Sequence, residues 1–342
     1  MEIKNLTKNQ VITSYNFARL SDIVYSELVT VEQYEELKNE NTKTIFKSSD
    51  QVLYINTKFK LHENDLIFCN SNLIESLFKE LNKIDNLKNL KLITNQTDKM
   101  VDEKLFNAKP KCISEWYSVN VNYVHEGLIP IPLGLSNDYS RKNLLYDDYQ
   151  NLTASQEKQT YIYSNFQVNT NYFHRTRVKN RLKDNPIVIF DDPNLENNKY
   201  IQNLVFYKYI VAPLGNGADS HRIWEALYAG SIPIVFDSPT FTTLNNLPHI
   251  YIDNISQLKK FSLIDKTNNE KFNFDKLNID WWLKKIRKNI IQSSKTSIFD
   301  NTKEFQNIYK NYYKSMKRDS FKKKFKTLIR KIMHKTKLKN IL

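Results

Sequence analysis

Short apolar runs, each followed by a cluster of polar residues, recur through the first 145 residues of the chain. Runs of this kind predict buried strands. The predicted strands lie at 52–56, 66–70, 90–95 and 128–135. Helical patterns at 72–87 and 101–107 lie between them. Strands that alternate with helices are typical of a parallel sheet covered by helices.

The apolar pattern lapses into polar residues between positions 136 and 158, and then it begins again. The lapse indicates a crossover between domains, and the length of 342 residues also favours two domains, because single cores rarely exceed about 250–300 residues. The second series has strands predicted at 160–165, 187–190, 209–212, 232–236 and 249–252. Helices are predicted near 171–183, 195–207, 219–229, 255–262, 279–292 and 302–315.

These elements predict the α/β fold class, with two Rossmann-like domains that face a cleft. The expected domains are residues 1–145 and 155–300, followed by C-terminal helices and a basic tail in residues 301–342. In such folds ligands bind at the carboxyl ends of the strands. We therefore expect the functional residues to lie in the cleft.

Composition narrows the class of protein. A hydrophobic fraction of 40%, with 19 Phe and 20 Tyr, argues against disorder. The two cysteines, Cys69 and Cys112, are too few for a disulfide framework, so we expect a reducing cytoplasm. The N-terminus lacks an apolar run of signal-peptide length, and no stretch approaches the roughly 20 apolar residues of a membrane span.

The basic charge is concentrated in one place. Residues 314–342 contain ten Lys and two Arg against the single acid Asp319, so most of the net charge of +14 lies there. Apolar residues recur at helical spacing within this tail, at Phe321, Phe325, Leu328, Ile329, Ile332 and Met333. A basic amphipathic helix of this kind can lie on an anionic membrane surface. Nucleic-acid binding and a merely solvated terminus are the alternatives.

Three of the five glycines, Gly215, Gly217 and Gly230, fall within sixteen residues. A strand ending at Ala212, the loop Gly215-Asn216-Gly217 and a helix starting near Asp219 predict a phosphate site, because free amides and the positive helix end attract anions. Glycine lets the main chain approach the phosphate closely.

The helix that follows this loop carries further candidates for a sugar-nucleotide site. At 100° per residue His221, Glu225 and Tyr228 share one face, which we expect to point away from the core, while Ile223 and Leu227 face the sheet. Glu225 could accept hydrogen bonds from a ribose diol, and His221 or Arg222 could neutralise a diphosphate. The alternative is that Asp219 or Ser220 only caps the helix and that Glu225 pairs with Arg222 in solvent.

The segment from Gly215 to Val235 resembles the donor-binding region of exostosin-like glycosyltransferases, which have the GT-B fold. Residues 93–98, 116–120 and 131–137 also resemble stretches of the acceptor-side domain of this family, whereas residues 1–88 show no match. The resemblance implies transfer of a sugar from a nucleotide-diphosphate donor to a glycan or lipid-linked acceptor, as in surface polysaccharide synthesis. It implies neither a cofactor nor a bound metal.

On this reading residues 1–145 form the acceptor side and residues 155–300 bind the donor. Asn165, Arg175 and Arg177 follow the first strand of the donor domain, where either arginine could grip the pyrophosphate or simply be solvated. An inverting enzyme needs a general base, for which Asp98 is the first candidate, although it could equally be a turn residue or helix N-cap. A retaining enzyme would need no such base.

Metal binding is not expected, because the histidines and cysteines lack metal-ligand spacing and Asp191-Asp192 leads into a turn at Pro193. We expect a cytoplasmic protein on the inner face of the membrane, held by residues 314–342, with no nucleic-acid partner. Three alternatives stay open. They are a polyol-phosphate transferase with a cytidine-diphosphate donor, a nucleic-acid-binding protein with a basic tail, and a nucleotide-binding module without turnover.

Overall fold

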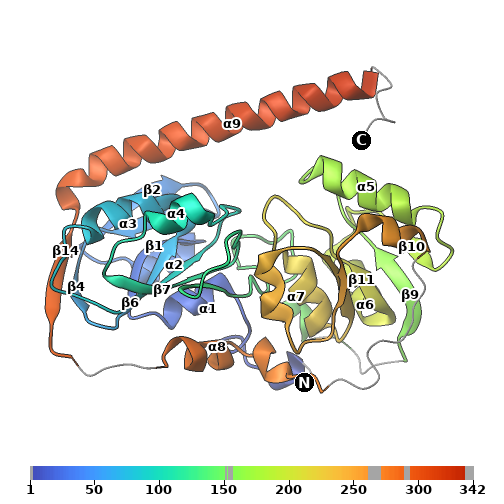
Figure 1. Ribbon diagram of the computed structural model, residues 1–342, viewed down its shortest axis with the longest axis horizontal. Helices are drawn as coiled ribbons and strands as arrows, with labels where there is room; N and C mark the ends of the chain where they lie inside the picture. Colours follow the sequence, from blue (N-terminus) through green and yellow to red (C-terminus); the bar gives the residue numbers. More distant parts are fainter. Residues whose placement is uncertain (1–2, 151, 153–156, 261–270, 289–292, 336–342) are drawn as a thin grey trace.

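The computed structural model describes residues 3–150, 152, 157–260, 271–288 and 293–335, with only the helical backbone for 322–335. It is an α/β structure with two large sheets that lie side by side (Figure 1). The α-helices are α1 Ser14–Arg19, α2 Val31–Leu37, α3 Ile74–Leu81, α4 Glu103–Asn107, α5 Tyr172–Leu182, α6 Asn197–Phe206, α7 His221–Tyr228, α8 Ile279–Ile286 and α9 Phe305–Lys335. The predicted α/β class is confirmed.

The first sheet has seven strands in the order β2-β3-β1-β5-β6-β7-β8. Their bounds are β1 Ile23–Thr30, β2 Thr42–Lys47, β3 Gln51–Asn56, β5 Leu66–Asn70, β6 Leu90–Asn95, β7 Ile113–Ser118 and β8 Leu128–Pro130. Strands β1, β5, β6, β7 and β8 pair in parallel, whereas β3 and β2 add an antiparallel edge. The prediction of a parallel sheet is correct for the predicted strands that correspond to β5, β6 and β8. The predicted strand at 52–56 is β3, which pairs antiparallel, and β1, β2 and β7 were not predicted.

The second sheet is wholly parallel, with five strands in the order β10-β9-β11-β12-β13. Their bounds are β9 Gln159–Ser164, β10 Val188–Phe190, β11 Tyr207–Val211, β12 Ile232–Phe236 and β13 Ile250–Ile252. All five were predicted, because each is a short apolar run between polar loops. Helix α7 ends before Gly230, whose φ of 70° is a left-handed conformation that suits glycine after a helix.

The C-terminal part of the chain returns to the first sheet. Strand β14 Thr296–Asp300 pairs antiparallel with β4 Lys58–His62 in a separate two-stranded sheet, next to α3. Helix α8 lies near the N-terminus, and the Ile279 amide donates to the Gln10 carbonyl over 2.9 Å. Segments within the predicted ranges 155–300 and 301–342 are therefore in contact with residues of the predicted range 1–145.

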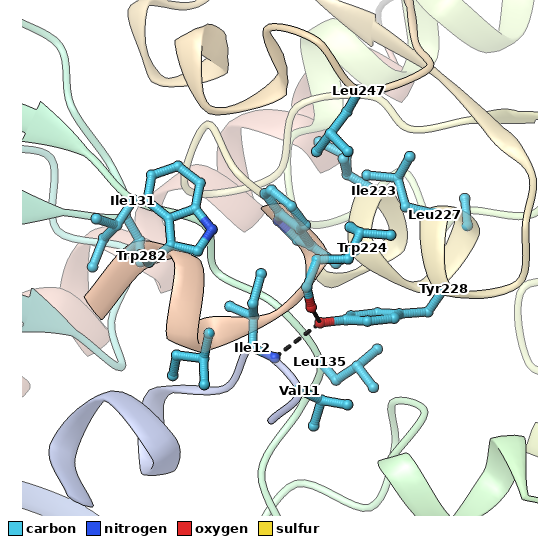
Figure 2. Packing of buried hydrophobic residues seen from close by; sticks show 14 of the residues in the cluster. Val11, Ile12, Ile131, Leu135, Ile223, Trp224, Leu227, Tyr228, Leu247 and Trp282 are labelled. Atoms are coloured by element: carbon cyan, nitrogen blue, oxygen red, sulfur yellow. Dashed lines mark hydrogen bonds between the residues drawn. The ribbon is translucent and has the colours of Figure 1, made fainter. Parts of the chain in front are cut away.

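One of the three hydrophobic cores is shared by the two sheets. Two of them belong to a single sheet each, together with its own helices. The shared core brings Val11, Ile12 and Ile131 together with Trp224 of α7 and Trp282 of α8 (Figure 2). Since both sheets bury apolar side chains in this core, their relative position is fixed by packing.

Helix α9 begins against the first sheet and then runs along the outside of both sheets (Figure 1). Ile308 is buried, but every residue from Lys314 to Phe321 is exposed. The predicted amphipathic face beyond Phe321 falls on residues whose side chains lie outside the described part of the chain. Within that part, no helix is both long enough and apolar enough to cross a membrane.

Candidate functional site

A cleft of about 1720 Å³ lies where the carboxyl ends of parallel strands from both sheets meet. Residues 96–99, which follow β6, and Asn72, which follows β5, line it from the first sheet. Loop residues that follow β9 and β11, among them Gln167 and Asn216, line it from the second sheet. Helix α9 contributes a third wall. The predicted location of the site, at the carboxyl ends of the strands, therefore coincides with the larger of the two described hollows.

The cleft reaches the point where the winding of the second sheet reverses. From β9 the chain goes outward to β10, and then it returns to β11 and continues through β12 to β13. Strands β9 and β11 are therefore neighbours whose loops leave in opposite directions. Such a switch point leaves a crevice between the two loops, and open parallel sheets bind nucleotide ligands there.

The N-terminus of α5 opens on this crevice. Thr170, Asn171, Tyr172 and Phe173 all line the cleft. Asn171 occupies the N-cap position, but its side chain does not cap the helix and instead donates to the Gly215 carbonyl over 3.0 Å. The first amides of a helix have no partner within the helix itself, and the positive end of the α5 dipole favours an anion in this crevice.

Arg175 ties together the two loops that border the switch point. Its Nη1 donates to the Gln167 carbonyl over 2.8 Å, and its Nε donates to the Leu214 carbonyl over 2.9 Å. Burial and the neighbouring Arg222 lower the pKa of Arg175 to about 10. Its guanidinium is thus held by loop carbonyls and does not line the cleft, so the prediction that it could grip a pyrophosphate there is not supported by its position.

Two further predicted residues near Arg175 also lie away from the cleft. Asn165 is buried and donates to the carbonyl of Asp192, which fixes the loop after β9 to the loop after β10. Arg177 is exposed on the outer side of α5. Neither residue lines the cleft.

The Gly215-Asn216-Gly217 turn lies at the cleft, but part of its predicted phosphate cradle is already occupied. Gly215 and Asn216 line the cleft, and Asn216 is exposed. The Gly215 amide donates to the Gly217 carbonyl over 3.1 Å. Asn120, which follows β7, accepts with its Oδ1 from the amides of Ala218 and Asp219 over 2.9 and 3.3 Å.

The contact with Asn120 explains the second glycine of the turn. A Cβ atom at Gly217 would lie 2.5 Å from Asn120 Oδ1, which is closer than any real contact. Glycine therefore serves close approach to a protein side chain here. The sequence interpretation missed Asn120, whose only local signal is its place just after a strand.

Asp219 and His221 connect α7 to the loop after β8. The buried Asp219 carboxylate accepts from Trp224 Nε1 over 2.9 Å and from the Leu133 amide over 2.9 Å. Burial raises the pKa of Asp219 to about 7. His221 Nδ1 lies 2.8 Å from the Gly134 carbonyl, and the Ser220 amide donates to Asp219. These side chains hold the two sheets together and do not line the cleft.

Glu225 lies inside the protein, with 3% of its surface exposed. Its carboxylate accepts from the Tyr200 hydroxyl over 3.0 Å and from the Leu144 amide over 3.4 Å. Tyr228 is buried on the same face, so the prediction that this face points away from the core is wrong. Apolar residues of the shared core cover α7 on its other sides as well.

Glu225 is therefore not placed to meet a ribose in the cleft. Arg222 is half-buried, and its guanidinium carbon lies 5.9 Å from the centre of the Tyr200 ring. Neither it nor Glu225 lines the cleft, and the predicted alternative of a solvent-exposed pair between them does not occur.

Asp98 lies in the loop after β6, where it is exposed and lines the cleft across from the α5 terminus. Its role as a base stays a prediction. Among the described residues, no three His, Cys, Asp or Glu side chains lie close enough to hold a metal ion.

Comparisons with known proteins add little to this geometry. No family model matches the chain, and no curated protein does. One solved structure that resembles it is the dodecameric iron-containing heptosyltransferase TibC in complex with ADP-D-beta-D-heptose. The match has 10% identity, covers 67% of this chain and 77% of that chain, and has a TM-score of 0.21. A likeness this low does not show a shared fold.

Proposed function

We propose that this protein is a glycosyltransferase that moves a sugar from a nucleoside-diphosphate donor to a glycan or lipid-linked acceptor. The observation that carries the proposal is the cleft at the β9–β11 switch point, where the N-terminal end of α5 meets the Asn216 turn. Nucleotide phosphates bind at such a point because free amides and the helix dipole favour an anion there. The resemblance of residues 215–235 to exostosin-like enzymes supports the same activity and a GT-B arrangement.

In this proposal the diphosphate lies between the α5 terminus and Asn216, and the acceptor lies against residues 96–99. The acceptor oxygen attacks the anomeric carbon, the bond from that carbon to the diphosphate oxygen breaks, and the nucleoside diphosphate leaves. In an inverting reaction Asp98 takes the proton from the acceptor hydroxyl. The amides at the α5 terminus stabilise the charge on the leaving group. Residues 314–342 would hold the enzyme on an anionic membrane surface.

The test is a thermal-shift and calorimetric panel of UDP, GDP, CDP, ADP and their sugar derivatives, with a cytidine-diphosphate polyol included. A ligand that binds the native state raises the melting temperature by mass action. We expect one nucleotide class to do so. Asn216→Asp should weaken its binding about tenfold, because a new negative charge then faces the diphosphate.

Asn180→Asp is the matched control, since Asn180 is exposed on α5 and does not line the cleft. It should leave the dissociation constant unchanged within about twofold. If no nucleoside diphosphate shifts the melting temperature, or if both variants bind equally well, the donor site is not here.

A further inference from the structure

Helix α9 is anchored at its N-terminal end. Phe305, Ile308 and Tyr312 pack on the core of the first sheet, and Lys79 Nζ lies 2.8 Å from Glu304. Beyond Tyr313 the described residues of the helix are fully on the surface. The helix nevertheless continues across the outside of the molecule towards α5 (Figure 1). Its exposed part is thus kept in place as a wall of the cleft without being part of a core.

One side of α9 forms this wall. Asn307, Asn311, Lys314, Ser315 and Arg318 line the cleft. They follow one another at intervals of three or four residues, apart from the adjacent Lys314 and Ser315, and such intervals place side chains on one side of a helix. Lys310 and Lys317 belong to the same helix but do not line the cleft. The basic residues of α9 are therefore divided into those that line the cleft and those that do not.

The cations of the cleft differ in their partners. Lys79 and Lys99 are paired, with Glu304 over 2.8 Å and with Glu75 over 3.0 Å. Lys314 and Arg318 form no ion pair with any described residue. They lie one turn apart, so both can reach the same anion. Asp319 also lines the cleft, but as the next residue after Arg318 it projects about 100° further around the helix.

Elsewhere the cleft also exposes apolar side chains, on the side of α9 that faces away from Lys314 and Arg318 and on α5. Met316 of α9 and Phe173 of α5 line it with 43% and 48% of their surfaces exposed. An acceptor that carries both a phosphate and an apolar group would find a partner for each.

We infer that Lys314 and Arg318 form a binding site for a phosphate group carried by the acceptor. This inference rests on the proposed function, and it assigns the acceptor to the class of phosphate-bearing molecules. The donor diphosphate occupies the α5 terminus, so the second phosphate lies on the α9 wall. The phosphate belongs to an isoprenoid phosphate or to a phosphorylated sugar, which share this chemistry.

The test compares two double variants of the full-length protein with equal changes of charge. Lys314→Glu with Arg318→Glu reverses the two charges of α9 that line the cleft, and Lys310→Glu with Lys317→Glu reverses two charges of α9 that do not line it. The probes are farnesyl phosphate, farnesol, glucose 6-phosphate and the best nucleoside diphosphate of the panel. Calorimetry measures the four dissociation constants. Sedimentation with phosphatidylglycerol vesicles measures attraction to a membrane.

We expect the cleft-side pair to weaken binding of a phosphate probe at least tenfold, whereas the other pair changes it less than twofold. Binding of the nucleoside diphosphate should be equal in both. Preference for farnesyl phosphate over farnesol identifies an isoprenoid source, and binding of glucose 6-phosphate identifies a sugar source; either result supports the site.

If the two double variants lose affinity for the phosphate probes equally, the effect is one of diffuse charge and the inference is overturned. The same holds if only vesicle binding is lost, equally in both. The inference is also overturned if the wild-type protein binds the nucleoside diphosphate but neither phosphate probe. If the nucleoside diphosphate itself does not bind, the failure belongs to the proposed function.

Discussion

Asp219 shows how a residue chosen for its chemistry can have a structural task. It lies beneath the turn at the cleft, and its carboxylate accepts three hydrogen bonds, from Trp224, Leu133 and Ser220. No cation neutralises it, so burial dominates and raises its pKa to about 7. The donors keep the carboxylate in place, but they do not compensate for its removal from water.

This raised pKa predicts a pH dependence of stability. The folded state holds the Asp219 proton more tightly than the unfolded state, whose pKa is near 3.8. The associated stability is fully present below pH 3.8 and is lost as the pH rises to about 7, by roughly 4 kcal/mol. Urea unfolding between pH 4 and 8 measures it. Asp219→Asn cannot titrate and should lose this part of the slope; identical slopes in the two proteins would contradict the assignment.

At the scale of elements, α5 positions the two loops that define the cleft. Its N-terminal end faces the crevice. Arg175, in its first turn, donates hydrogen bonds to carbonyls of both loops. Helix α7, by contrast, is buried on every side between the second sheet and the shared core. Helix α7, whose sequence predicted the site, therefore connects the two sheets, and α5 is the helix whose N-terminal end lines the cleft.

Arg175→Met should loosen both loops. The carbonyls of Gln167, Pro213 and Leu214 lose a charged donor in a buried place, and we expect the free energy of unfolding to fall by about 2–5 kcal/mol. Nucleoside-diphosphate affinity should fall with it, because the crevice is no longer held open. Arg177→Met is the control on the same helix; this exposed change should stay within about 0.5 kcal/mol. Denaturant titration measures the free energy of unfolding of both variants. Equal values would refute the role of Arg175.

At the scale of the whole molecule, the two sheets depend on one another. The Tyr228 hydroxyl of α7 accepts from the Ile12 amide over 2.9 Å and donates to the Leu277 carbonyl over 2.6 Å (Figure 2). Thr240 Oγ1 accepts from the Val121 amide over 3.0 Å and also lies 3.0 Å from the Val121 carbonyl, to which it donates. These bonds and the shared core join parts of the chain that are far apart in sequence.

We therefore expect one cooperative unfolding transition for both sheets. Tyr228→Phe leaves a buried amide and a buried carbonyl without partners and should destabilise the whole molecule by about 2–5 kcal/mol. Hydrogen exchange in a urea series, read by mass spectrometry, reports separately on β6 of the first sheet and on β11 of the second sheet. Their urea midpoints should coincide, and both should shift together when Tyr228→Phe is added. Two separate midpoints would mean that the sheets unfold independently.

Local patterns predicted a large part of the fold. The strands of the second sheet were all found, because each is a short apolar run that ends in polar residues. Strands β1 and β2 were missed, since their buried side chains include polar residues such as Ser26, Glu27 and Thr42. Polar residues in a strand hide its pattern until their hydrogen-bond partners are known. For the same reason the antiparallel edge was not predicted.

The sequence by itself determined the α/β class, the polar turn at Asn216 and the position of a cleft at the strand ends, because periodicity and loop residues are local properties. The tertiary structure decided which polar side chains the cleft contains. Asn120 meets the amides of residues 218 and 219 from the other sheet, and Tyr200 and Leu144 take Glu225 into the interior. The α9 wall is likewise set by the pairing of β14 with β4. A sequence shows which groups need a partner, but the partner itself is supplied by chain segments that only packing brings together.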